Sequence, residues 1–437
     1  MTSLSVLDKS VAFITMGCAK NEVDTYTMST KLKRAGYTII DTPEQADVVI
    51  VNTCSFIQSA TEESIETILD VSQYDSIASG TGHLVVAGCM PARYGEDLTR
   101  ELPEARAFVP CSKEDDIVEV LDKLFDITRS SAGSDKDVLN EAAPLSMYVK
   151  ISDGCNRFCS FCSIPYIRGR YHSFTFQDIY ANISDLVSRG TKEIVLIAQD
   201  TGRWGDDFKE KSSLASLIDR LALVFPTTWF RVMYIQPEGI TDELLDVIAR
   251  RANVCNYLDI PFQHVNAQVL KRMRRRGSAQ EYDELCRHIR EKIPDCIIRT
   301  TFIVGFPGES DDDFEELCNY VEEADLDYIG IFPYSREEGT RAYDLENQVP
   351  KEVKMQRARQ LRELADCVCT PRMAARIGSR ASVLMLGYDE DGMLYGRTAF
   401  QAPDVDGCTF VDRGTPGEVA NVTITDSLLY ELEASRA

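Results

Sequence analysis

The chain has 437 residues, 44% hydrophobic and 27% charged, a composition that excludes a disordered or fibrous protein and predicts two or three globular domains. Its formal net charge of −23 argues against a broad electrostatic grip on nucleic-acid phosphates. It starts without a signal-peptide pattern and has no apolar run of membrane-spanning length, so its 14 cysteines indicate metal or redox chemistry in the cytoplasm, away from any membrane, rather than disulfides.

Residues 8–126 are predicted to form an open parallel α/β domain, because short β-rich runs alternate there with amphipathic stretches. The runs lie at 11–16, 47–53, 83–87 and 107–110. Residues 127–143 have little apolar content and are predicted to be a linker.

Three cysteines directly follow three of these runs: Cys18, Cys54 and Cys89. The carboxyl ends of parallel strands converge on one crevice, so three thiolates can meet there and hold an iron–sulfur cluster with one iron left open. Free cysteine is also a common small core residue, and Cys111, which closes the fourth run, competes as a ligand. Spacing alone leaves a cluster and buried thiols both open.

Residues 144–372 are predicted to form a second βα series, a partial (β/α)6 barrel with its chemistry at the carboxyl ends of the strands. The predicted strands lie at 147–151, 193–198, 229–235, 257–261, 297–304 and 328–332. A helical run rich in Lys, Arg and Glu follows at about 351–367.

Cys155, Cys159 and Cys162 form a CxxxCxxC triplet directly after the first of these strands. Three thiolates suit a four-iron cubane with one open iron. A zinc knuckle or buried thiols are the alternatives, but the nearest histidine, His172, does not fit the common zinc spacings. In this spacing the chain resembles the radical S-adenosylmethionine (SAM) superfamily. The resemblance implies that SAM chelates the open iron and is split by one electron into a 5′-deoxyadenosyl radical.

Four further residues are candidates for binding SAM. Gly305 and Gly308 follow the fifth strand and resemble the glycine motif that packs against SAM in these barrels, with a simple βα turn as the alternative. Gln199 lies at a strand end facing the expected site, and Arg168 follows the cysteine triplet and is able to grip the SAM carboxylate with two hydrogen bonds. Structural support is an equal alternative for Gln199 and Arg168.

Residues 373–437 are predicted to form a small antiparallel β-barrel, from short β-rich runs broken by Gly, Asp and Pro turns. The runs lie at 381–386, 394–398, 409–411 and 417–424. From Arg376 to Ala437 there are 5 Arg and no Lys against 10 acidic residues. A barrel that binds transfer RNA should be basic on one face, whereas an acidic one suits a basic protein, although acidic charge also serves solubility.

The three N-terminal cysteine segments resemble the cysteine motifs of the methylthiotransferase family of radical SAM enzymes, and the C-terminal barrel resembles that family's TRAM domain. The segments are Met16-Gly-Cys18-Ala-Lys-Asn-Glu-Val-Asp24, Asn52-Thr-Cys54-Ser-Phe-Ile57 and Gly88-Cys89-Met-Pro91. The resemblance covers nearly the whole chain. It implies that these cysteines hold an auxiliary cluster carrying the sulfur to be transferred, giving two [4Fe-4S] clusters with SAM as methyl donor and radical source.

Several segments resemble the branch of that family that modifies an aspartate in a ribosomal protein. They are Gly17-Cys-Ala-Lys-Asn21, Ile197-Ala-Gln-Asp-Thr201, Leu258-Asp-Ile-Pro-Phe-Gln-His264, Phe332-Pro-Tyr-Ser-Arg-Glu-Glu-Gly-Thr340 and Asp344-Leu-Glu-Asn-Gln-Val-Pro350. The transfer-RNA branch typically carries Gln-Met where Ala19 and Lys20 stand, and the ribosomal branch more often has Pro in place of Ala19.

The resemblance implies addition of a methylthio group to the β-carbon of an aspartate in protein twelve of the small ribosomal subunit. Methylthiolation of adenosine in transfer RNA is the alternative. A non-catalytic electron carrier is a third interpretation, but carriers normally saturate their irons with four protein ligands. The implied partners are the basic ribosomal protein, an electron donor such as flavodoxin or ferredoxin, and a sulfur source that the sequence does not identify.

Overall fold

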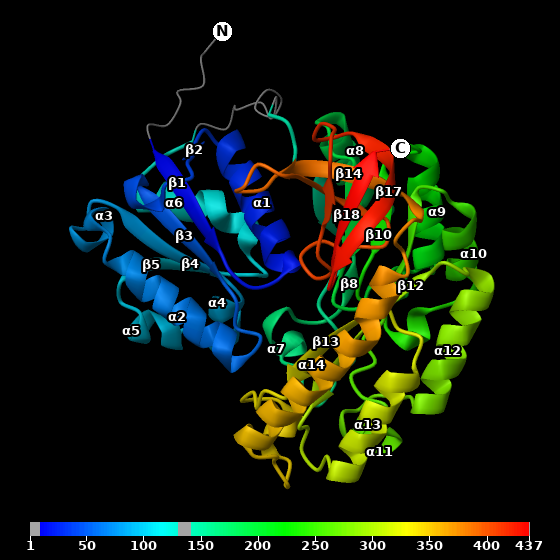
Figure 1. The fold of residues 1–437 in the computed structure, drawn as a ribbon. Helices are drawn as coiled ribbons and strands as arrows, with labels where there is room; N and C mark the ends of the chain where they lie inside the picture. The colour runs from blue at the N-terminus through cyan, green and yellow to red at the C-terminus, as the bar shows by residue number, and fades with distance from the viewer. Residues whose placement is uncertain (1–8, 130–140, 437) are drawn as a thin grey trace.

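The computed structural model of the chain describes residues 9–129 and 141–436 (Figure 1). Residue 8 of the predicted first domain, residues 130–140 of the predicted linker and residue 437 lie outside the described residues. No helix in the described ranges is long and apolar enough to cross a membrane.

The N-terminal part is a five-stranded parallel sheet in the order β2-β1-β3-β4-β5, with helices on both faces (Figure 1). Its strands are β1 (Ser10–Thr15), β2 (Thr38–Ile39), β3 (Val48–Thr53), β4 (His83–Gly88) and β5 (Ala105–Pro110). Its helices are α1 (Ala19–Arg34), α2 (Gln58–Ser72), α3 (Asp75–Ala78), α4 (Cys89–Tyr94), α5 (Asp97–Glu101) and α6 (Ile117–Leu124).

Strand β3 shows why this sheet forms, since all six of its residues are buried. Val48 and Ile50 pack beneath α1 and α6, whereas Val49 and Val51 pack on the opposite face beneath α2. Alternate side chains of a strand point to opposite faces, so an unbroken apolar run is stable only when both faces are covered.

The second part is an open six-stranded parallel sheet in the order β13-β12-β11-β10-β9-β6, the predicted partial barrel. Its strands are β6 (Ser146–Lys150), β9 (Glu193–Ile197), β10 (Trp229–Val232), β11 (Val254–Asp259), β12 (Ile297–Val304) and β13 (Tyr328–Pro333). Its helices are α7 (Ile164–Ile167), α8 (Phe176–Ser188), α9 (Leu214–Val224), α10 (Asp242–Arg250), α11 (Ala267–Arg272), α12 (Ala279–Lys292) and α13 (Asp311–Glu323). Strands β7 (Ser152–Asp153) and β8 (His172–Ser173) pair antiparallel as a separate two-stranded sheet, and the segment between them carries the second cysteine triplet and α7.

Helix α14 (Lys351–Ala374) lies along β13 and leads to a closed five-stranded barrel in the order β14-β15-β16-β18-β17 (Figure 1). Its strands are β14 (Arg380–Tyr388), β15 (Leu394–Thr398), β16 (Thr409–Val411), β17 (Val419–Leu428) and β18 (Glu431–Arg436). The prediction of an antiparallel barrel needs one correction, because β16 and β18 pair in parallel while the other neighbours are antiparallel. Short 3-10 helices occur at Pro43–Gln45, Glu114–Asp116, Thr201–Arg203, Pro237–Gly239 and Arg341–Asp344.

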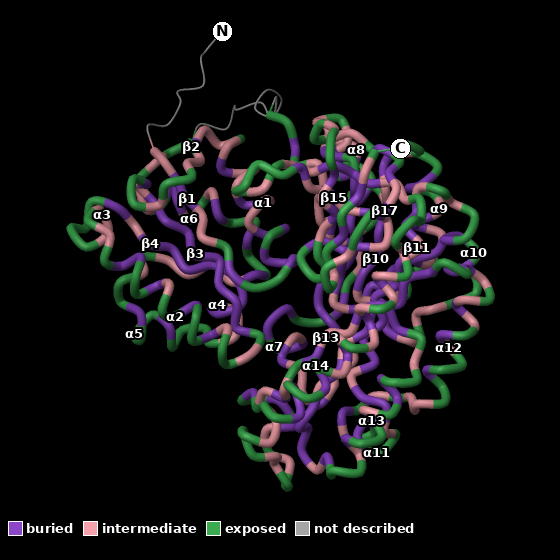
Figure 2. Tube along the Cα trace, viewed as in Figure 1, coloured by how far each residue is buried: buried purple, intermediate pink, exposed green. Residues whose placement is uncertain are grey.

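The C-terminal barrel closes one end of the partial barrel. Arg231, which is fully buried on β10, binds Glu193 at 3.0 Å and donates to the carbonyls of Thr398 and Ala399 at 3.2 and 2.9 Å. Glu193 is the first residue of β9, so the contact lies at the amino-terminal end of the strands. Figure 2 shows buried residues along the strands of both the N-terminal sheet and the partial barrel. The carboxyl-terminal end, where (β/α) barrels place their chemistry, therefore faces the cysteine loops.

Candidate active site

The three N-terminal cysteines lie where the sequence places them, at the carboxyl ends of neighbouring strands. Cys18 precedes α1, Cys54 directly follows β3, and Cys89 opens α4 after β4. The loops are close together: Gly17 has φ +93°, and a Cβ on it would lie 2.6 Å from Cys54 Cβ. Only glycine allows this approach, so the Gly-Cys pair brings two of the three thiols into one crevice.

The thiols of this triplet differ in their electrostatics. Burial raises the pKa of Cys54 to about 11, although the Phe56 amide hydrogen-bonds its sulfur. A hydrogen bond with Cys111, aided by the Arg168 guanidinium 3.9 Å away, lowers the pKa of Cys89 to about 7 despite burial. The same hydrogen bond raises the pKa of Cys111. The pair thus favours the thiolate, the form that binds metal, on Cys89 rather than on Cys111.

Cys155, Cys159 and Cys162 lie in the loop between β7 and α7. Burial raises the pKa of Cys155 and Cys162, and Cys159 adds to both shifts, so the three sulfurs lie near one another. The backbone amide of Arg157 hydrogen-bonds Cys155, and that of Ile164 hydrogen-bonds Cys162. Amide donors directed at sulfur stabilise the thiolate ligands of iron–sulfur clusters, so the loop fits such a group.

Both triplets consist of free thiols. In the described part of the chain, no three His, Cys, Asp or Glu side chains are grouped tightly enough to bind a single metal ion. A cubane places four irons and their sulfides between its ligands, so it needs thiols that face a common space rather than touch.

The two cysteine loops are linked directly. Ser163, next to Cys162, donates from Oγ to the carbonyl of Phe56 at 3.0 Å, and Phe56 is two residues beyond Cys54. Glu337 on the loop after β13 accepts from the Gln58 amide at 2.7 Å. The sheet and the partial barrel therefore present their cysteines at one interface.

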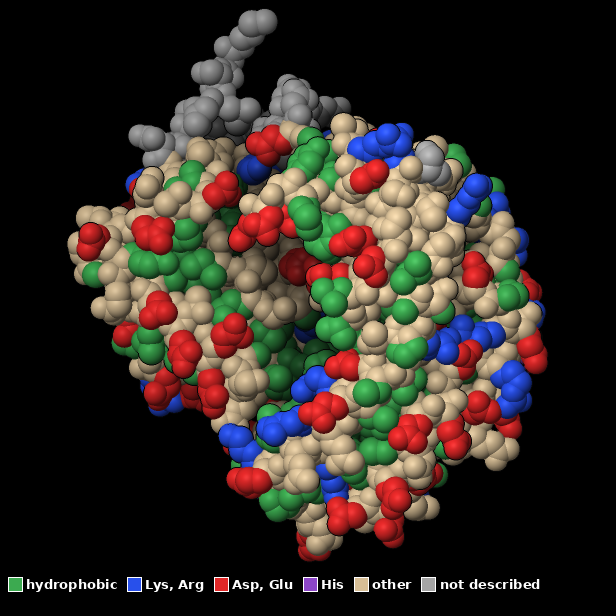
Figure 3. All heavy atoms as spheres, viewed as in Figure 1, with side chains coloured by type: hydrophobic (Ala, Val, Ile, Leu, Met, Phe, Trp, Pro, Cys, Tyr) green, Lys and Arg blue, Asp and Glu red, His purple; other side chains and the backbone are tan. Residues whose placement is uncertain are grey.

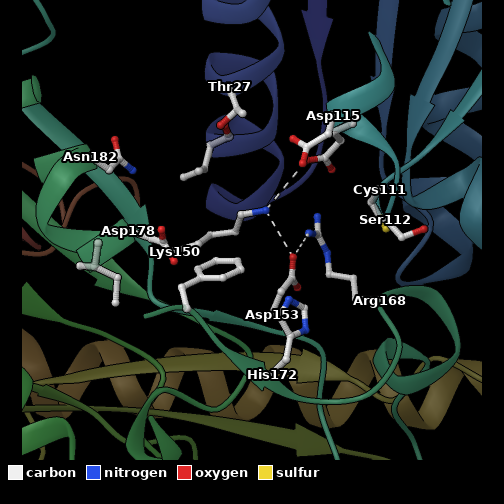
Figure 4. Close-up of a pocket in the computed structure, with 14 residues that line it drawn as sticks. Thr27, Cys111, Ser112, Asp115, Lys150, Asp153, Arg168, His172, Asp178 and Asn182 are labelled. Atoms are coloured by element: carbon white, nitrogen blue, oxygen red, sulfur yellow. Dashed lines mark hydrogen bonds and ion pairs between the residues drawn. The ribbon is translucent and has the colours of Figure 1, made fainter. Parts of the chain in front are cut away.

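Arg168 lies at the centre of that interface. Its guanidinium donates to Asp24 at 2.7 Å and to Asn21 at 2.9 Å. It also donates to Asp153 at 3.3 Å, a contact that Figure 4 shows. Lys150 also pairs with Asp24 and lies 3.3 Å from Asp153. The guanidinium N–H groups of Arg168, which were predicted to bind the SAM carboxylate, are thus already bound by two carboxylates of the chain. Asp24 comes from α1 and Asp153 from β7.

The other candidates for SAM lie around the barrel mouth. Gln199 donates from Nε2 to Asp153 Oδ1 at 2.8 Å, while its buried Oε1 has no partner among the described residues. The Gly308 carbonyl accepts from Arg272 at 2.9 Å. Gly305 has φ +73° and packs so closely on the Lys354 side chain that a Cβ would overlap it. The turn is therefore tightly packed against α11 and α14.

Lys20 is a residue of this interface that sequence reasoning did not single out. It is 8% exposed, and its Nζ lies 3.2 Å from the centroid of the Tyr234 ring. Burial lowers its pKa to about 8, and the surrounding charges include Cys18, Asp259 and Arg168. Tyr234 itself is held at φ +64°, which is uncommon for a bulky residue. In the sequence, only the position of Lys20 two residues after Cys18 could have pointed to it.

A cavity of about 400 Å³ opens beside the network, between α1, β6 and α8 (Figure 4). Glu114 lines it with only 8% exposure, its Oε1 unpartnered among the described residues and its Oε2 4.0 Å from Lys150. Burial, followed by the nearby Asp24 charge, raises the pKa of Glu114 to about 9. Burial and the Asp24 charge therefore favour the protonated form of Glu114 in the folded chain.

Replacing Glu114 by glutamine is expected to stabilise the protein at pH 8 and to have little effect at pH 5. Between the pKa of the unfolded chain, 4.5, and the folded value of about 9, the folded state binds the extra proton, so the free energy of unfolding falls as pH rises. Glutamine removes that loss, and the interval from 4.5 to pH 8, at about 1.4 kcal/mol per pH unit, sets an upper limit of about 5 kcal/mol on the gain at pH 8. Urea unfolding at both pH values measures it, and an equal shift at pH 5 and pH 8 would contradict this assignment.

Comparison with known proteins agrees with this arrangement. The Radical SAM superfamily matches residues 149–321, the uncharacterized protein family UPF0004 matches residues 10–110, and the TRAM domain matches residues 377–436. Membership of the Radical SAM superfamily implies one [4Fe-4S] cluster and SAM.

Solved structures with similar folds are radical SAM enzymes. The methyltransferase TsrM from Kitasatospora setae, with cobalamin and a [4Fe-4S] cluster bound, has a TM-score of 0.54 at 14% identity, over 77% of this chain and 74% of its own. The cobalamin-dependent enzyme OxsB has a TM-score of 0.52 at 13% identity, over 83% of this chain and 57% of its own. At this identity the likeness concerns the fold alone.

Two relatives match almost the entire chain. The ribosomal protein uS12 methylthiotransferase RimO of Trichlorobacter lovleyi is 40% identical over 439 residues, 98% of each chain. That of Geobacter sulfurreducens is 40% identical over 443 residues, 98% of this chain and 99% of its own. The chain therefore belongs to the RimO family of radical SAM methylthiotransferases.

Proposed function

We propose that this enzyme adds a methylthio group to the β-carbon of an aspartate in ribosomal protein uS12. The observation that carries the proposal is the joining of two cysteine triplets at one interface, through the Ser163–Phe56 hydrogen bond and the contact of Arg168 with Cys89. The names of the full-length relatives supply the substrate. Attack on an unactivated C–H bond cannot be achieved by acid–base catalysis, so two reactive centres held around one carbon suit this reaction.

Cys155, Cys159 and Cys162 would hold the [4Fe-4S] cluster that binds SAM, and Cys18, Cys54 and Cys89 a second one. When bound, these groups supply the radical that opens the C–H bond and the sulfur that replaces the hydrogen. The chain contributes amide donors to the sulfurs and a shared, largely buried interface. Cys111 would act as a proton-bearing partner of Cys89 rather than as a ligand.

For SAM itself we propose Gln199, whose buried Oε1 lacks a partner among the described residues, and the turn of Gly305 and Gly308. Arg168 is proposed as a positioning residue, because its donors already bind Asp24 and Asp153. It would orient Asp153, and through it Gln199, which donates to the same carboxylate.

The surface around the interface suits a basic substrate. Figure 3 shows a hollow between the N-terminal sheet and the rest of the molecule, with acidic side chains gathered along its upper margin. Glu22 on α1 and Asp404 in the C-terminal barrel are both among the exposed residues. Partial desolvation of the carboxyl is the larger cause of the raised pKa of Glu22, and the Asp404 charge is the second, so two like charges meet here. A basic ribosomal protein would relieve this repulsion. Such a substrate implies a cytoplasmic enzyme, together with a one-electron donor of the flavodoxin or ferredoxin kind and a separate sulfur source.

Anaerobic reconstitution with iron, sulfide, SAM and a reductant tests the function. We expect 5′-deoxyadenosine to form, and mass spectrometry to find a methylthio group on uS12 and none on bulk transfer RNA. Methylthio groups on the RNA alone would show that the substrate is adenosine, and absence of 5′-deoxyadenosine would refute the enzyme assignment.

A further inference from the structure

Lys20 is a buried cation without a carboxylate partner. It is 8% exposed and makes no salt bridge within residues 9–129 and 141–436, and its Nζ lies over the face of the Tyr234 ring, 3.2 Å from the centroid. Lys150, the neighbouring buried lysine, instead pairs with Asp24 and Asp153. Burying an ammonium without an anion is costly unless a ligand later supplies one.

The carboxylates around Lys20 are already bound by other cations. Asp153 accepts from Arg168, Lys150, Gln199 and its neighbouring amide. Lys150 and Arg168 each pair with both Asp24 and Asp153, whereas Lys20 pairs with neither, and the strongest attraction on its ammonium comes from the Cys18 thiol. Lys20 is therefore left without a carboxylate of its own, beside a cysteine that is proposed to bind the second cluster.

Asp259, the remaining carboxylate near Lys20, is occupied in the same way. It accepts from Arg299 at 2.9 Å and from the Tyr234 amide at 3.1 Å. The second contact holds Tyr234 in its left-handed conformation, φ +64°, with its ring over Nζ. A strained residue fixed by two partners indicates that the position of the ammonium is built into the fold.

We propose that Lys20 forms a carboxylate subsite that receives the side chain of the substrate aspartate. The proposal rests on the function given above. In aspartate the β-carbon is bonded directly to the carboxylate carbon, so a clamp on the carboxylate fixes the reacting carbon. Lys20 lies two residues from Cys18 and shares the interface with Asp153, two residues before Cys155. A carboxylate bound there holds its β-carbon between the two cysteine triplets.

The subsite also accounts for selection of aspartate over asparagine. An amide places a neutral group against the ammonium, which loses one charge-assisted hydrogen bond and leaves the cation unpaired. We expect the reconstituted wild-type enzyme to bind uS12 about 10- to 100-fold more tightly than the uS12 variant that has asparagine at the selected aspartate.

The experiment compares binding of uS12 with that of a panel of uS12 variants in which each aspartate in turn is asparagine. Affinities are measured by biolayer interferometry on reconstituted full-length enzyme without reductant, so that no turnover occurs. In Lys20→Met, which keeps most of the length of the side chain but removes its charge, we expect the preference at the selected aspartate to disappear because unaltered uS12 binds more weakly while the asparagine variant binds as before. Lys20→Arg should retain part of it, and Lys192→Met, which removes an exposed lysine just before β9 of the partial barrel, should retain it fully.

Persistence of the aspartate preference in Lys20→Met would overturn the proposal. Equal loss of affinity for every uS12 variant, together with loss of bound iron, would overturn it as well, because Lys20 would then serve the Cys18 cluster rather than the substrate. Methylthiolation of uS12 by the wild-type enzyme is read separately by mass spectrometry. If uS12 were not methylthiolated but the binding preference for aspartate remained, the proposed reaction would be refuted and the carboxylate subsite would still be supported.

Discussion

Replacing Cys159 by alanine is expected to abolish both 5′-deoxyadenosine formation and methylthiolation, with a fall in rate of at least roughly 10³-fold. Cys159 is the central cysteine of the loop between β7 and α7, and it is the thiol that perturbs both of its neighbours. Two remaining thiolates cannot hold a cubane that normally needs three protein ligands to leave one iron open. Quantification of 5′-deoxyadenosine by chromatography measures the loss.

The matched change in the other triplet should separate the two roles. In Cys89→Ala we expect 5′-deoxyadenosine to form still, because the loop of Cys155 is intact, while methylthiolated uS12 is absent. Cys367→Ala removes an exposed cysteine from α14, outside both triplets, and should leave both products unchanged. Loss of 5′-deoxyadenosine in Cys89→Ala would contradict the division of labour between the triplets.

Much of the fold could be predicted from the sequence, because parallel strands buried on both faces are nearly continuous apolar runs. The run predicted at 47–53 is strand β3 (Val48–Thr53), and the run at 297–304 is β12 without change. Strand β10 was predicted to reach residue 235 but ends at Val232, since the Tyr234 amide turns away to the Asp259 side chain. That hydrogen bond links the end of β10 to β11, so the local composition around residue 235 could not predict it.

Strand β18 (Glu431–Arg436) was missed for a related reason. Its sequence, ELEASR, is mostly polar, and it forms a strand because β16 and β17 supply hydrogen bonds on both sides. The division between residues 372 and 373 stays a prediction, and α14 runs without interruption across it to Ala374.

The candidate site, like the fold, could be predicted from the sequence only in part. The cysteines could be placed from sequence, because each follows a strand and the ends of parallel strands share an edge. The role of Arg168 could not, since its partner Asp24 lies 144 residues away in the chain. Lys20 lies within a recognised motif, yet its lack of a carboxylate partner is evident only once the neighbouring carboxylates are seen to be occupied.

Replacing Arg168 by methionine is expected to lower the free energy of unfolding by about 3–5 kcal/mol at pH 7. The guanidinium is buried and binds Asp24 and Asp153, so its removal leaves two buried carboxylates facing Lys150 alone. Urea unfolding followed by circular dichroism measures the change. Arg287→Met is the matched control, because Arg287 pairs with Asp283 on the exposed face of α12 and such pairs contribute only about 0.3–0.5 kcal/mol.

The difference in free energy of unfolding between the wild type and Arg168→Met should shrink as pH falls toward 4. Burial alone would raise the pKa of Asp153, but Lys150 and Arg168 hold it below its usual value, so in the wild type its contribution is present above the unfolded pKa and is lost as pH falls through the folded one. Without Arg168 the folded pKa of Asp153 rises, and the variant takes up a proton in the folded state that relieves the unpaired charge. A deficit that is constant from pH 7 to pH 4 would show that Arg168 stabilises the interface by packing rather than by charge.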